Sequence, residues 1–585
     1  MNEEQLHPKR HTLAHLLGAA VLEIYPGSKL TLGPSIEDGF YYDIDVSGKI
    51  SEGDLSKIED KMRELLPTWT SFSHKKNTPE EAKNVFANNE YKSELIDEIA
   101  AKGEDITLYT SGTFTDLCRG GHVENPSVDI TEGSWKLDRV AGAYWRGSEK
   151  NKMLTRIYGL AFESKEKLDE YLNMREEAQK RDHRKIGQEQ KLFFVDEMVG
   201  KGLIMWQPNG TIIRDEIEKF ARTMESDAGY VRVVTPHLAK EELFLTSGHL
   251  PYYKDDMYPA MVMELDGTKY YLKAMNCPHH HIIFRHEHRS YRDLPVRLAE
   301  YGTVYRNELS GTLAGLLRVR CLAMNDAHIY CRKDQIRDEF KNALALTMKY
   351  FEIFGLKDYW FRLSLWDPER KDKYVDEPEN WNYTEGVLRD VLVELGVKFI
   401  EVKDEAAFYG PKVDIQFKSV IGRTESMSTV QLDFIAKKRF ELSYVDETGK
   451  VNDEIFVIHR APLSTHERFT AFLIEHYAGI WPTWLAPVQV RIVPVSEKFN
   501  DFSMSVLSSL KSAGVRADLD GASDTLGKRI RNAKTEKVPY VVVIGEKEVT
   551  ANSLTIEKRS GDKIENISVE NFVEILNEEI STRKS

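Results

Sequence analysis

Two pairs of side chains, each spaced by four residues, stand out in the first quarter of the chain. His11 and His15 lie in RHTLAHLLG, and Cys118 and His122 lie in DLCRGGHV. On a helix, residues i and i+4 lie on one face, so two imidazoles would project together. A cysteine and a further histidine would then complete either a four-ligand zinc set or a hydrolytic pocket. The alternative is that these are ordinary surface or core histidines, because 17 histidines make chance pairs common.

A second cluster centres on Cys277, in KAMNCPHHHIIF. Cysteine beside histidine suggests a metal, but this segment cannot supply a tetrahedral set by itself. His328 in NDAHIYC and His459 in VIHRAP are candidate partners, and other histidines compete with them. Three protein ligands with an open fourth position would make a substrate-binding zinc site.

Three arginines form a further set, namely Arg306 in YRNE, Arg318 in LLRVR and Arg468 in THERF. A guanidinium fork matches phosphate oxygens in a bidentate manner. A single arginine beside an acid is more often a salt bridge, so each arginine alone is weak evidence for a phosphate site.

The periodicity of the chain predicts the elements that must position these residues. LAHLLGAAVLEIY, which carries His15, is predicted to form an amphipathic helix, and GFYYDIDV a strand. Residues 163–186 are charge-dense with a helical period, which predicts a solvated connecting helix at a domain boundary, or an exposed helix within one domain.

From Gly187 to Leu485, helical runs such as TIIRDEIEKFARTM alternate with strand-like runs such as YVRVVTP, PVRLAEYGTVYRNE, VDIQFKSV and TVQLDFI. Strands without βαβ spacing indicate a mostly antiparallel sheet with helices on it. After Pro487 the order changes to β-α-β-α-β, which predicts a small α/β domain.

Length and composition limit the class of protein. The 585 residues correspond to about three to five domains of roughly 100–200 residues each. The net charge of −14 excludes a simple basic nucleic-acid coat, although it allows a large enzyme with a local basic surface. Four cysteines are too few for a disulfide scaffold, and no apolar run is long enough to span a membrane, so we expect a cytoplasmic protein.

Ordered motifs along nearly the whole chain resemble the threonyl-tRNA synthetase family of class II aminoacyl-tRNA synthetases. The motifs are RHTLAHLLG, GFYYDID, DLCRGGHV, AGAYWRG, NKMLTRIYG, RDHRKIG, GHLPYYKDDM, KAMNCP, LPVRLAEYGTVYRNELSG, NDAHIYC, AFYGPKVD, TVQLDF, HRAPLSTHERF, WPTWLAPVQV and VPYVVVIG. The resemblance implies an α+β multidomain protein: an editing domain with its connecting helix at 1–185, a class II catalytic domain on an antiparallel sheet at 186–485, and an α/β anticodon-binding domain at 486–585. The family often has a further small domain before the editing domain, and we expect this chain to lack it.

The resemblance also implies roles for the residues noted above. The implied zinc ligands are Cys277, His328 and His459. The implied ATP contacts are Arg306, Glu308, Arg318 and Arg468, with Arg306 and Arg468 as the catalytic pair. The implied threonine contacts are Asp326, Tyr409, Lys412 and Gln431. The implied editing pocket comprises His11, His15, Asp116, Cys118 and His122, where the question of a metal stays open.

These roles imply a ligase that activates threonine with ATP, transfers it to the 3′ end of tRNA(Thr) and hydrolyses mischarged seryl-tRNA(Thr). The implied cofactors are one Zn²⁺ per chain and Mg²⁺ with ATP, and the implied partner besides the substrates is a second copy of the chain. That copy would pair through TIIRDEIEKFARTM and the strand ending at Pro236. The alternatives are a free-standing seryl-tRNA deacylase, which would have no use for the arginines and the zinc triple, and a non-catalytic binder of tRNA-like RNA.

The chain departs from the family's usual pattern at positions of the adenine and threonine pockets. Leu322 stands where the family usually has an aromatic residue, and Met324 and Ser426 stand where it usually has glutamines. Ser464 and Thr465 lie in a segment that is usually glycine-rich, and His279 replaces a residue that is commonly glycine. In the tail, Glu548 falls on an anticodon-contact position and Glu557 on one that is commonly basic. The helix around Lys528, Arg529 and Arg531 is either a contact for tRNA phosphates or a solvated face.

Overall fold

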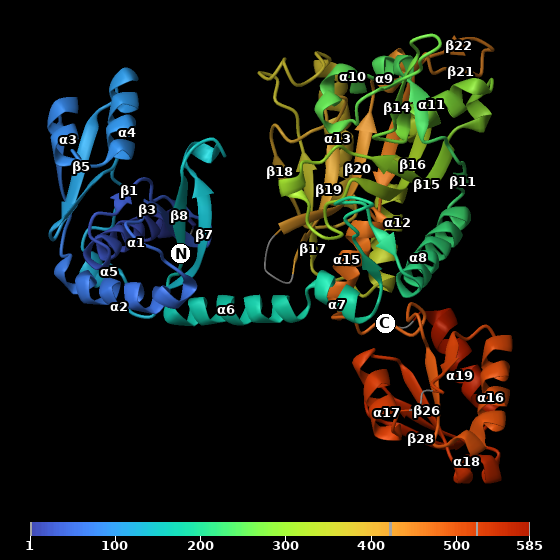
Figure 1. Ribbon diagram of the computed structural model, residues 1–585. Coiled ribbons are helices and arrows are strands. Elements are labelled where there is room, and N and C mark those ends of the chain that lie inside the picture. Colours follow the sequence, from blue (N-terminus) through green and yellow to red (C-terminus); the bar gives the residue numbers. More distant parts are fainter. Residues whose placement is uncertain (1–2, 420–423, 522–523, 584–585) are drawn as a thin grey trace. The chain divides into compact units, whose positions relative to one another are not determined.

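The computed structural model describes residues 3–419, 424–521 and 524–583. The chain divides between Glu176 and Glu177 into two compact units, called here the N-terminal and the C-terminal unit (Figure 1). Within the described residues, we find no helix that is both long and apolar enough to cross a membrane.

A long helix and a sheet form the core of the N-terminal unit. The sheet has the order β1-β3-β8-β7, with β1 at Lys29–Leu30, β3 at Gly39–Asp45, β8 at Met153–Ala161 and β7 at Trp135–Tyr144, and β2 at Ser35–Ile36 pairs with β3. Helix α1 (Glu3–Ile24) places Leu13, Leu17 and Val21 on one face by its four-residue period, and all three are fully buried. They share a core with the side chains of β3, so the predicted helix and the predicted strand are confirmed. The prediction that the helix is amphipathic is wrong, because every residue from Thr12 to Val21 is buried and this stretch has no solvent-facing side.

A second sheet in this unit has the order β4-β5-β6, with β4 at Ser73–Asn77, β5 at Ile106–Ser111 and β6 at Phe114–Leu117. Helix α4 (Glu90–Ala101) contacts β5. Strand β6 ends one residue before Cys118, so this sheet delivers the second half of the histidine and cysteine cluster.

The prediction of one continuous helix over residues 163–186 is wrong. Helix α6 (Lys165–Lys180) ends there, and α7 (His183–Glu189) is a separate helix. Asp182 causes the break, because its φ of −51° and ψ of 119° are not helical and its side chain accepts a hydrogen bond from the backbone N–H of Arg184 at 2.7 Å. Aspartate at this position is a preferred helix N-cap.

An eight-stranded sheet organises the C-terminal unit. Its order is β11-β15-β16-β23-β20-β19-β17-β18, with β11 at Val231–Arg232, β15 at Val296–Tyr305, β16 at Cys321–Arg332, β23 at Ile455–Ala461, β20 at Thr424–Asp433, β19 at Lys412–Lys418, β17 at Tyr359–Ser364 and β18 at Phe399–Val402. The interior pairs are antiparallel, and only the two edge pairs, β11 with β15 and β17 with β18, are parallel. The predicted antiparallel sheet is therefore confirmed, although the run YVRVVTP forms only the two-residue strand β11.

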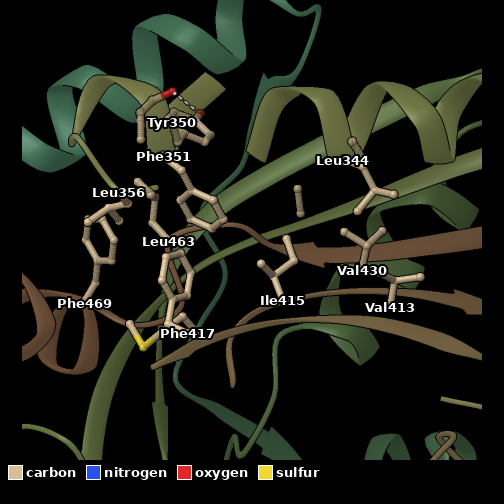
Figure 2. Close-up of a cluster of buried hydrophobic side chains, with 14 of the residues drawn as sticks. Leu344, Tyr350, Phe351, Leu356, Val413, Ile415, Phe417, Val430, Leu463 and Phe469 are labelled. Atoms are coloured by element: carbon tan, nitrogen blue, oxygen red, sulfur yellow. Dashed lines mark hydrogen bonds between the residues drawn. The ribbon is translucent and has the colours of Figure 1, made fainter. Parts of the chain in front are cut away.

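Helices cover this sheet and enclose its core. Helix α12 (Ile336–Ile353) packs against β16, β20 and β23. Figure 2 shows the resulting contact layer, in which Leu344 and Phe351 of α12 meet Ile415 of β19 and Val430 of β20, while Phe469 comes from α15 (His466–Tyr477). Helix α8 (Pro208–Asp227) contributes Ile213, Ile217 and Phe220 to the same core. These helices and the sheet thus share one packed core.

The end of the chain forms a separate five-stranded sheet of order β25-β24-β26-β27-β28. The segments in chain order are β24 (Val490–Pro494), α16 (Asn500–Ser512), β25 (Ala517–Leu519), α17 (Leu526–Thr535), β26 (Tyr540–Ile544), α18 (Glu546–Ala551), β27 (Leu554–Lys558), β28 (Lys563–Ile567) and α19 (Val569–Thr582). The first three strands are parallel, as the predicted β-α-β-α-β order requires. The antiparallel pair β27 and β28 was not predicted.

Two candidate functional sites

The N-terminal unit brings together all four residues of the first cluster. His11 and His15 project from α1, and Cys118 and His122 follow β6. One ligand atom from each residue lies within 4.8 Å of the others. The ring centroids of His11 and His122 are 4.4 Å apart, and those of His15 and His122 are 4.6 Å apart.

The two pairs reach this arrangement by different routes. The histidines of α1 use the helical period, as predicted, whereas the segment CRGGH is a loop. Gly120 and Gly121 have φ values of 90° and 84°, a left-handed conformation that glycine adopts most readily. This loop folds back so that the Sγ of Cys118 lies 3.2 Å from Nε2 of His122. A Cβ at position 120 would also meet the Tyr109 hydroxyl at 2.5 Å, so the turn requires glycine.

Burial keeps the four groups uncharged in the metal-free protein. It lowers the pKa of His11, lowers that of His15 well below the usual value, and lowers that of His122 to about 2. Burial also raises the pKa of the Cys118 thiol to about 11. Neutral imidazoles offer lone pairs to a metal or to the protons of a water molecule, so the chemistry of the cluster suits a tetrahedral cation and an oriented water equally.

A buried polar network lies beside these four residues. Asp116, on β6, forms an ion pair with Lys92 of α4 at 2.5 Å and accepts a hydrogen bond from the Tyr42 hydroxyl. Its Oδ1 also accepts a hydrogen bond from the backbone N–H of Leu117 at 2.8 Å, and its Oδ2 lies 3.7 Å from Nδ1 of His15. Sequence reasoning did not find Lys92 or Tyr42. Tyr42 lies in the conspicuous strand GFYYDID, but nothing in the sequence around Lys92 distinguishes it from a surface lysine.

A cavity of about 390 Å³ opens onto this network. It is lined by residues of the cluster, by Asp116, Lys92 and Tyr42, and by the apolar side chains of Leu32, Leu95 and Ile99. This volume lies in the range of small-molecule sites, about 300–1,000 Å³. A ligand of nucleoside size therefore fits beside the histidines.

The second site, in the C-terminal unit, brings together Cys277, His328 and His459. Cys277 is the first residue of α11 (Cys277–His286), while His328 and His459 face each other as cross-strand partners on β16 and β23. One ligand atom from each lies within 4.8 Å of the others. The register of the two strands thus selects these histidines from the 17 in the chain.

Each histidine of this triple has one ring nitrogen hydrogen-bonded and the other available. Nε2 of His459 lies 3.2 Å from Oδ2 of Asp433, whose Oδ1 accepts from the backbone N–H groups of Ile435 and Ala436. Nδ1 of His328 lies 2.8 Å from Nδ1 of His280. Such hydrogen bonds orient imidazole ligands in metal sites. Sequence reasoning missed Asp433 and His280, although His280 belongs to the noted CPHHH run.

The residues expected around a small amino acid also lie near this triple. Asp326 accepts a hydrogen bond from Nδ2 of Asn276 at 3.0 Å, and burial raises the pKa of the Asp326 carboxyl. The Tyr409 hydroxyl donates to Oε1 of Gln431. Lys412 forms an ion pair with Asp414 at 2.8 Å. Carboxylate, amide and hydroxyl groups thus line the same cavity as the candidate metal-binding triple.

A cavity of about 550 Å³ contains the triple, and two of the three expected arginines line it. Arg306 follows β15, and Arg468 is on α15, where its Nε donates to the carbonyl of Leu317 at 3.3 Å. Arg318 instead pairs with Glu308 at 2.8 Å, and its side chain is half exposed. Neither residue of that pair lines the cavity. A phosphate in the cavity would therefore meet Arg306 and Arg468 first.

Three of the departures from the family pattern line the large cavity, and Leu322 belongs to an apolar cluster against which one of the three, Met324, packs. Met324, Ser426 and Ser464 line the large cavity, so they do shape it. Leu322 is buried in a small apolar cluster with Val304 and Val319 instead.

The tail residues mostly have structural partners. Glu548 accepts from the backbone N–H of Gly545 at 2.9 Å. Arg529 is buried and donates to the carbonyl of Pro494, so its guanidinium supports the fold. Lys528 pairs with Asp524 at 2.9 Å and remains accessible.

Comparison with known proteins matches three segments to family models. Residues 261–477 match the tRNA synthetase class II core domain (G, H, P, S and T), and residues 489–579 match an anticodon binding domain. Residues 106–158 match the threonyl and alanyl tRNA synthetase second additional domain.

Full-length relatives are also similar. The chain is 46% identical over 580 residues to threonine–tRNA ligase of Geobacillus sp. (strain WCH70), covering 99% of this chain and 89% of that protein. It is 45% identical over 585 residues to threonine–tRNA ligase of Staphylococcus aureus (strain Newman), covering 100% and 90%. A crystal structure of the RNA binding domain of threonyl-tRNA synthetase from Cryptosporidium parvum Iowa II superimposes with a TM-score of 0.64 at 32% identity, covering 68% of this chain and 98% of that one.

Proposed function

The chain belongs to the threonine–tRNA ligase family, and on that premise we propose that it activates threonine with ATP and transfers it to tRNA(Thr). The observation that carries the proposal is the position of Cys277, His328 and His459 in one cavity with Arg306 and Arg468. A candidate metal-binding triple in one cavity with two guanidinium groups suits the activation of an amino acid by a nucleotide.

The donor set fits zinc. One sulfur and two imidazoles match the preferred ligands of Zn²⁺, and three protein ligands leave a position for substrate. When bound, zinc would supply Lewis-acid coordination of a substrate amine and hydroxyl. In the metal-free protein, burial raises the pKa of Cys277, so binding must displace the thiol proton.

The residues around the triple supply selectivity against valine. Asp326 lies on the same strand as His328, two residues away, and its carboxyl can bond a threonine hydroxyl. Tyr409, Gln431 and Lys412 line the same cavity. Valine has the shape of threonine without the hydroxyl, and a site built to bind a hydroxyl rejects such an analogue by about 10⁴–10⁵-fold.

Serine requires a different solution. It keeps the hydroxyl and lacks one methyl group, which is worth only about 1–3 kcal/mol. A second, hydrolytic site for seryl-tRNA(Thr) follows from this arithmetic. The cluster of His11, His15, Cys118 and His122, with Asp116 beside it, is our proposed editing site.

The activation step needs positive charge on the triphosphate. Arg306 and Arg468 would stabilise the charge that develops as the threonine carboxylate attacks the α-phosphate, with Mg²⁺ bound to the ATP. Glu308 and Arg318, which are paired in this structure, would have to separate before either contacts ATP.

We propose that the three functions follow the chain in order. The editing domain with its connecting helix comprises residues 1–185, the catalytic domain residues 186–485 and the anticodon-binding domain residues 486–585. We also propose a homodimer formed through α8 and the segment up to Pro236, since Val231 and Val234 are 57% and 85% exposed there.

The test is amino-acid-dependent exchange of pyrophosphate into ATP, with zinc content measured on the same sample. Threonine should support exchange, serine should support weaker exchange, and valine should support none, with about one zinc per chain. Protein that holds zinc and shows no exchange with threonine would contradict the proposal.

A further inference from the structure

A line of buried side chains runs from the metal-binding triple into the protein. His280 and Glu300 are 0% and 5% exposed, and neither lines a substrate cavity. Nδ1 of His328 lies 2.8 Å from Nδ1 of His280, and Nε2 of His280 lies 3.2 Å from Oε2 of Glu300. The last acceptor in this line is therefore a carboxylate.

The environment of Glu300 contains donors only. Its Oε1 accepts from the backbone N–H of Thr235 at 2.8 Å, and its Oε2 accepts from the Thr235 hydroxyl at 2.8 Å. Lys273, fully buried, donates to that hydroxyl at 2.7 Å and lies 3.8 Å from Oε2. Glu300 can therefore only accept a hydrogen bond from His280.

The direction of the hydrogen bond from His280 to Glu300 determines the tautomers of both histidines. Because Glu300 accepts, Nε2 of His280 carries a proton, and an imidazole with its single proton on Nε2 has its lone pair on Nδ1. Nδ1 of His280 must then accept from Nδ1–H of His328. The lone pair of His328 is left on Nε2, the nitrogen that remains available for a metal.

We propose that Glu300 and His280 are positioning residues that hold His328 in the tautomer and orientation required to bind the zinc ion. The inference rests on the proposed function, since it concerns the metal of that site. It extends the site by two residues that bind neither metal nor substrate. Their contribution lies in the affinity for zinc, because an imidazole in the wrong tautomer has no lone pair at the metal.

Two substitutions test this line of hydrogen bonds, one at Glu300 and one at His280. In Glu300→Gln, the amide NH₂ would donate to Nε2 of His280 and reverse both tautomers, with little change in volume. In His280→Leu, the acceptor for His328 is removed. Each should weaken zinc binding about 10–100-fold, the usual effect of such partners, measured by competition with a chromophoric chelator. The Co²⁺-loaded variants should show altered d–d absorption.

Two further variants separate orientation from packing. His280→Asn places an amide oxygen close to the position of Nδ1, so it should restore affinity relative to His280→Leu. Glu339→Gln is the matched control. Glu339 is also 5% exposed, but it pairs with Arg297 at 2.7 Å and has no contact with His328. It should leave zinc affinity unchanged.

The proposal is overturned if Glu300→Gln and His280→Leu bind zinc as tightly as the unmodified chain. It is equally overturned if His280→Asn is as weak as His280→Leu in a folded protein, because the effect would then be one of volume. Failure of the proposed function would give a different result. If the unmodified chain binds zinc but shows no pyrophosphate exchange with threonine, the ligase activity is contradicted. The zinc affinities of the variants would still decide the roles of Glu300 and His280.

Discussion

At the scale of single residues, Cys277 supplies the only sulfur of the metal-binding triple. Replacing it with alanine removes one of three ligands, and two histidines alone do not make a stable zinc site. Cys277→Ala should therefore lose bound zinc and abolish threonine-dependent pyrophosphate exchange. Hydrolysis of seryl-tRNA(Thr) should continue, because the proposed editing cluster belongs to the other unit. Loss of both activities in a folded variant would show that the two sites depend on each other.

His15 gives the reverse case. It contributes a buried imidazole to the editing cluster and lies 3.7 Å from Asp116. His15→Ala should leave threonine activation unchanged and allow seryl-tRNA(Thr) to accumulate in aminoacylation assays with serine. Continued removal of seryl-tRNA(Thr) at the normal rate would exclude this cluster as the editing site.

The titration of the same cluster predicts a pH window for the N-terminal unit. In the unfolded chain each histidine titrates near 6.5, whereas burial lowers the pKa of His11, His15 and His122 in the fold. Below pH ~6.5 the unfolded chain binds protons that the fold does not, so the unfolding free energy falls by up to about 1.4 kcal/mol per pH unit for each such histidine. Pulse proteolysis of metal-free protein in urea should show this decline from pH 7 to 5.

Cys118 should set the alkaline limit of that window. Its pKa is raised to about 11 in the fold, so above pH ~8.5 the unfolded thiol loses its proton first and stability falls as pH rises.

His122→Phe should make the acidic decline in stability shallower, since one histidine with a lowered pKa is removed. A flat profile between pH 7 and 5 would contradict the neutral state assigned to the cluster.

At the scale of elements, helix α8 supports the strands that carry the metal-binding triple. Glu225, 3% exposed, accepts hydrogen bonds from Arg460 at 2.8 Å and from Asn325 at 3.0 Å. Arg460 is adjacent to His459 on β23, and Asn325 is adjacent to Asp326 on β16. One carboxylate of the helix therefore fixes the spacing of both strands at the site.

Removing the negative charge of Glu225 should lower the free energy of unfolding strongly. In Glu225→Gln the guanidinium of Arg460 stays fully buried without its counter-charge, and breaking a buried pair costs about 3–5 kcal/mol. Glu216 on the same helix pairs with Arg516 at 3.0 Å but is partly exposed, so Glu216→Gln should cost under about 1 kcal/mol. Thermal unfolding of the two variants, followed by tryptophan fluorescence, should show a clearly larger loss for Glu225→Gln. Equal losses would mean that burial of the pair is unimportant.

At the scale of the whole molecule, an exposed apolar edge argues for a second copy of the chain. Val231 and Val234 lie at the edge strand β11 and just after it, and a bare strand edge with apolar side chains is normally covered. Val234→Asp should convert a dimer to a monomer in size-exclusion chromatography with light scattering. Val393→Asp is the matched control, because Val393 is 65% exposed on α13 (Pro378–Glu394) away from that edge. A dimer that survives Val234→Asp would place the interface elsewhere.

The sequence by itself determined the elements and the chemistry of the chain. Helical and strand periods are local, so α1, β3 and the antiparallel character of the large sheet could be predicted from neighbouring residues. The pairing of His11 with His15 was also predictable, because four residues make one helical turn. The break at Asp182 was missed, since charge density along residues 163–186 concealed a single capping residue.

From residue types and periodicity alone, only the tertiary structure decided which distant residues meet, although the resemblance to the threonyl-tRNA synthetase family had already implied the triple of Cys277, His328 and His459. Cys277, His328 and His459 are brought together by strand register and by the start of a helix, and 17 histidines allow many other triples. Lys92 and Glu300 carry no local signal, because a buried charge is distinguished from a surface charge only by what the fold places around it. Protonation follows the same rule: burial lowers the pKa of His15 and raises that of Cys118, and burial is a property of the whole fold.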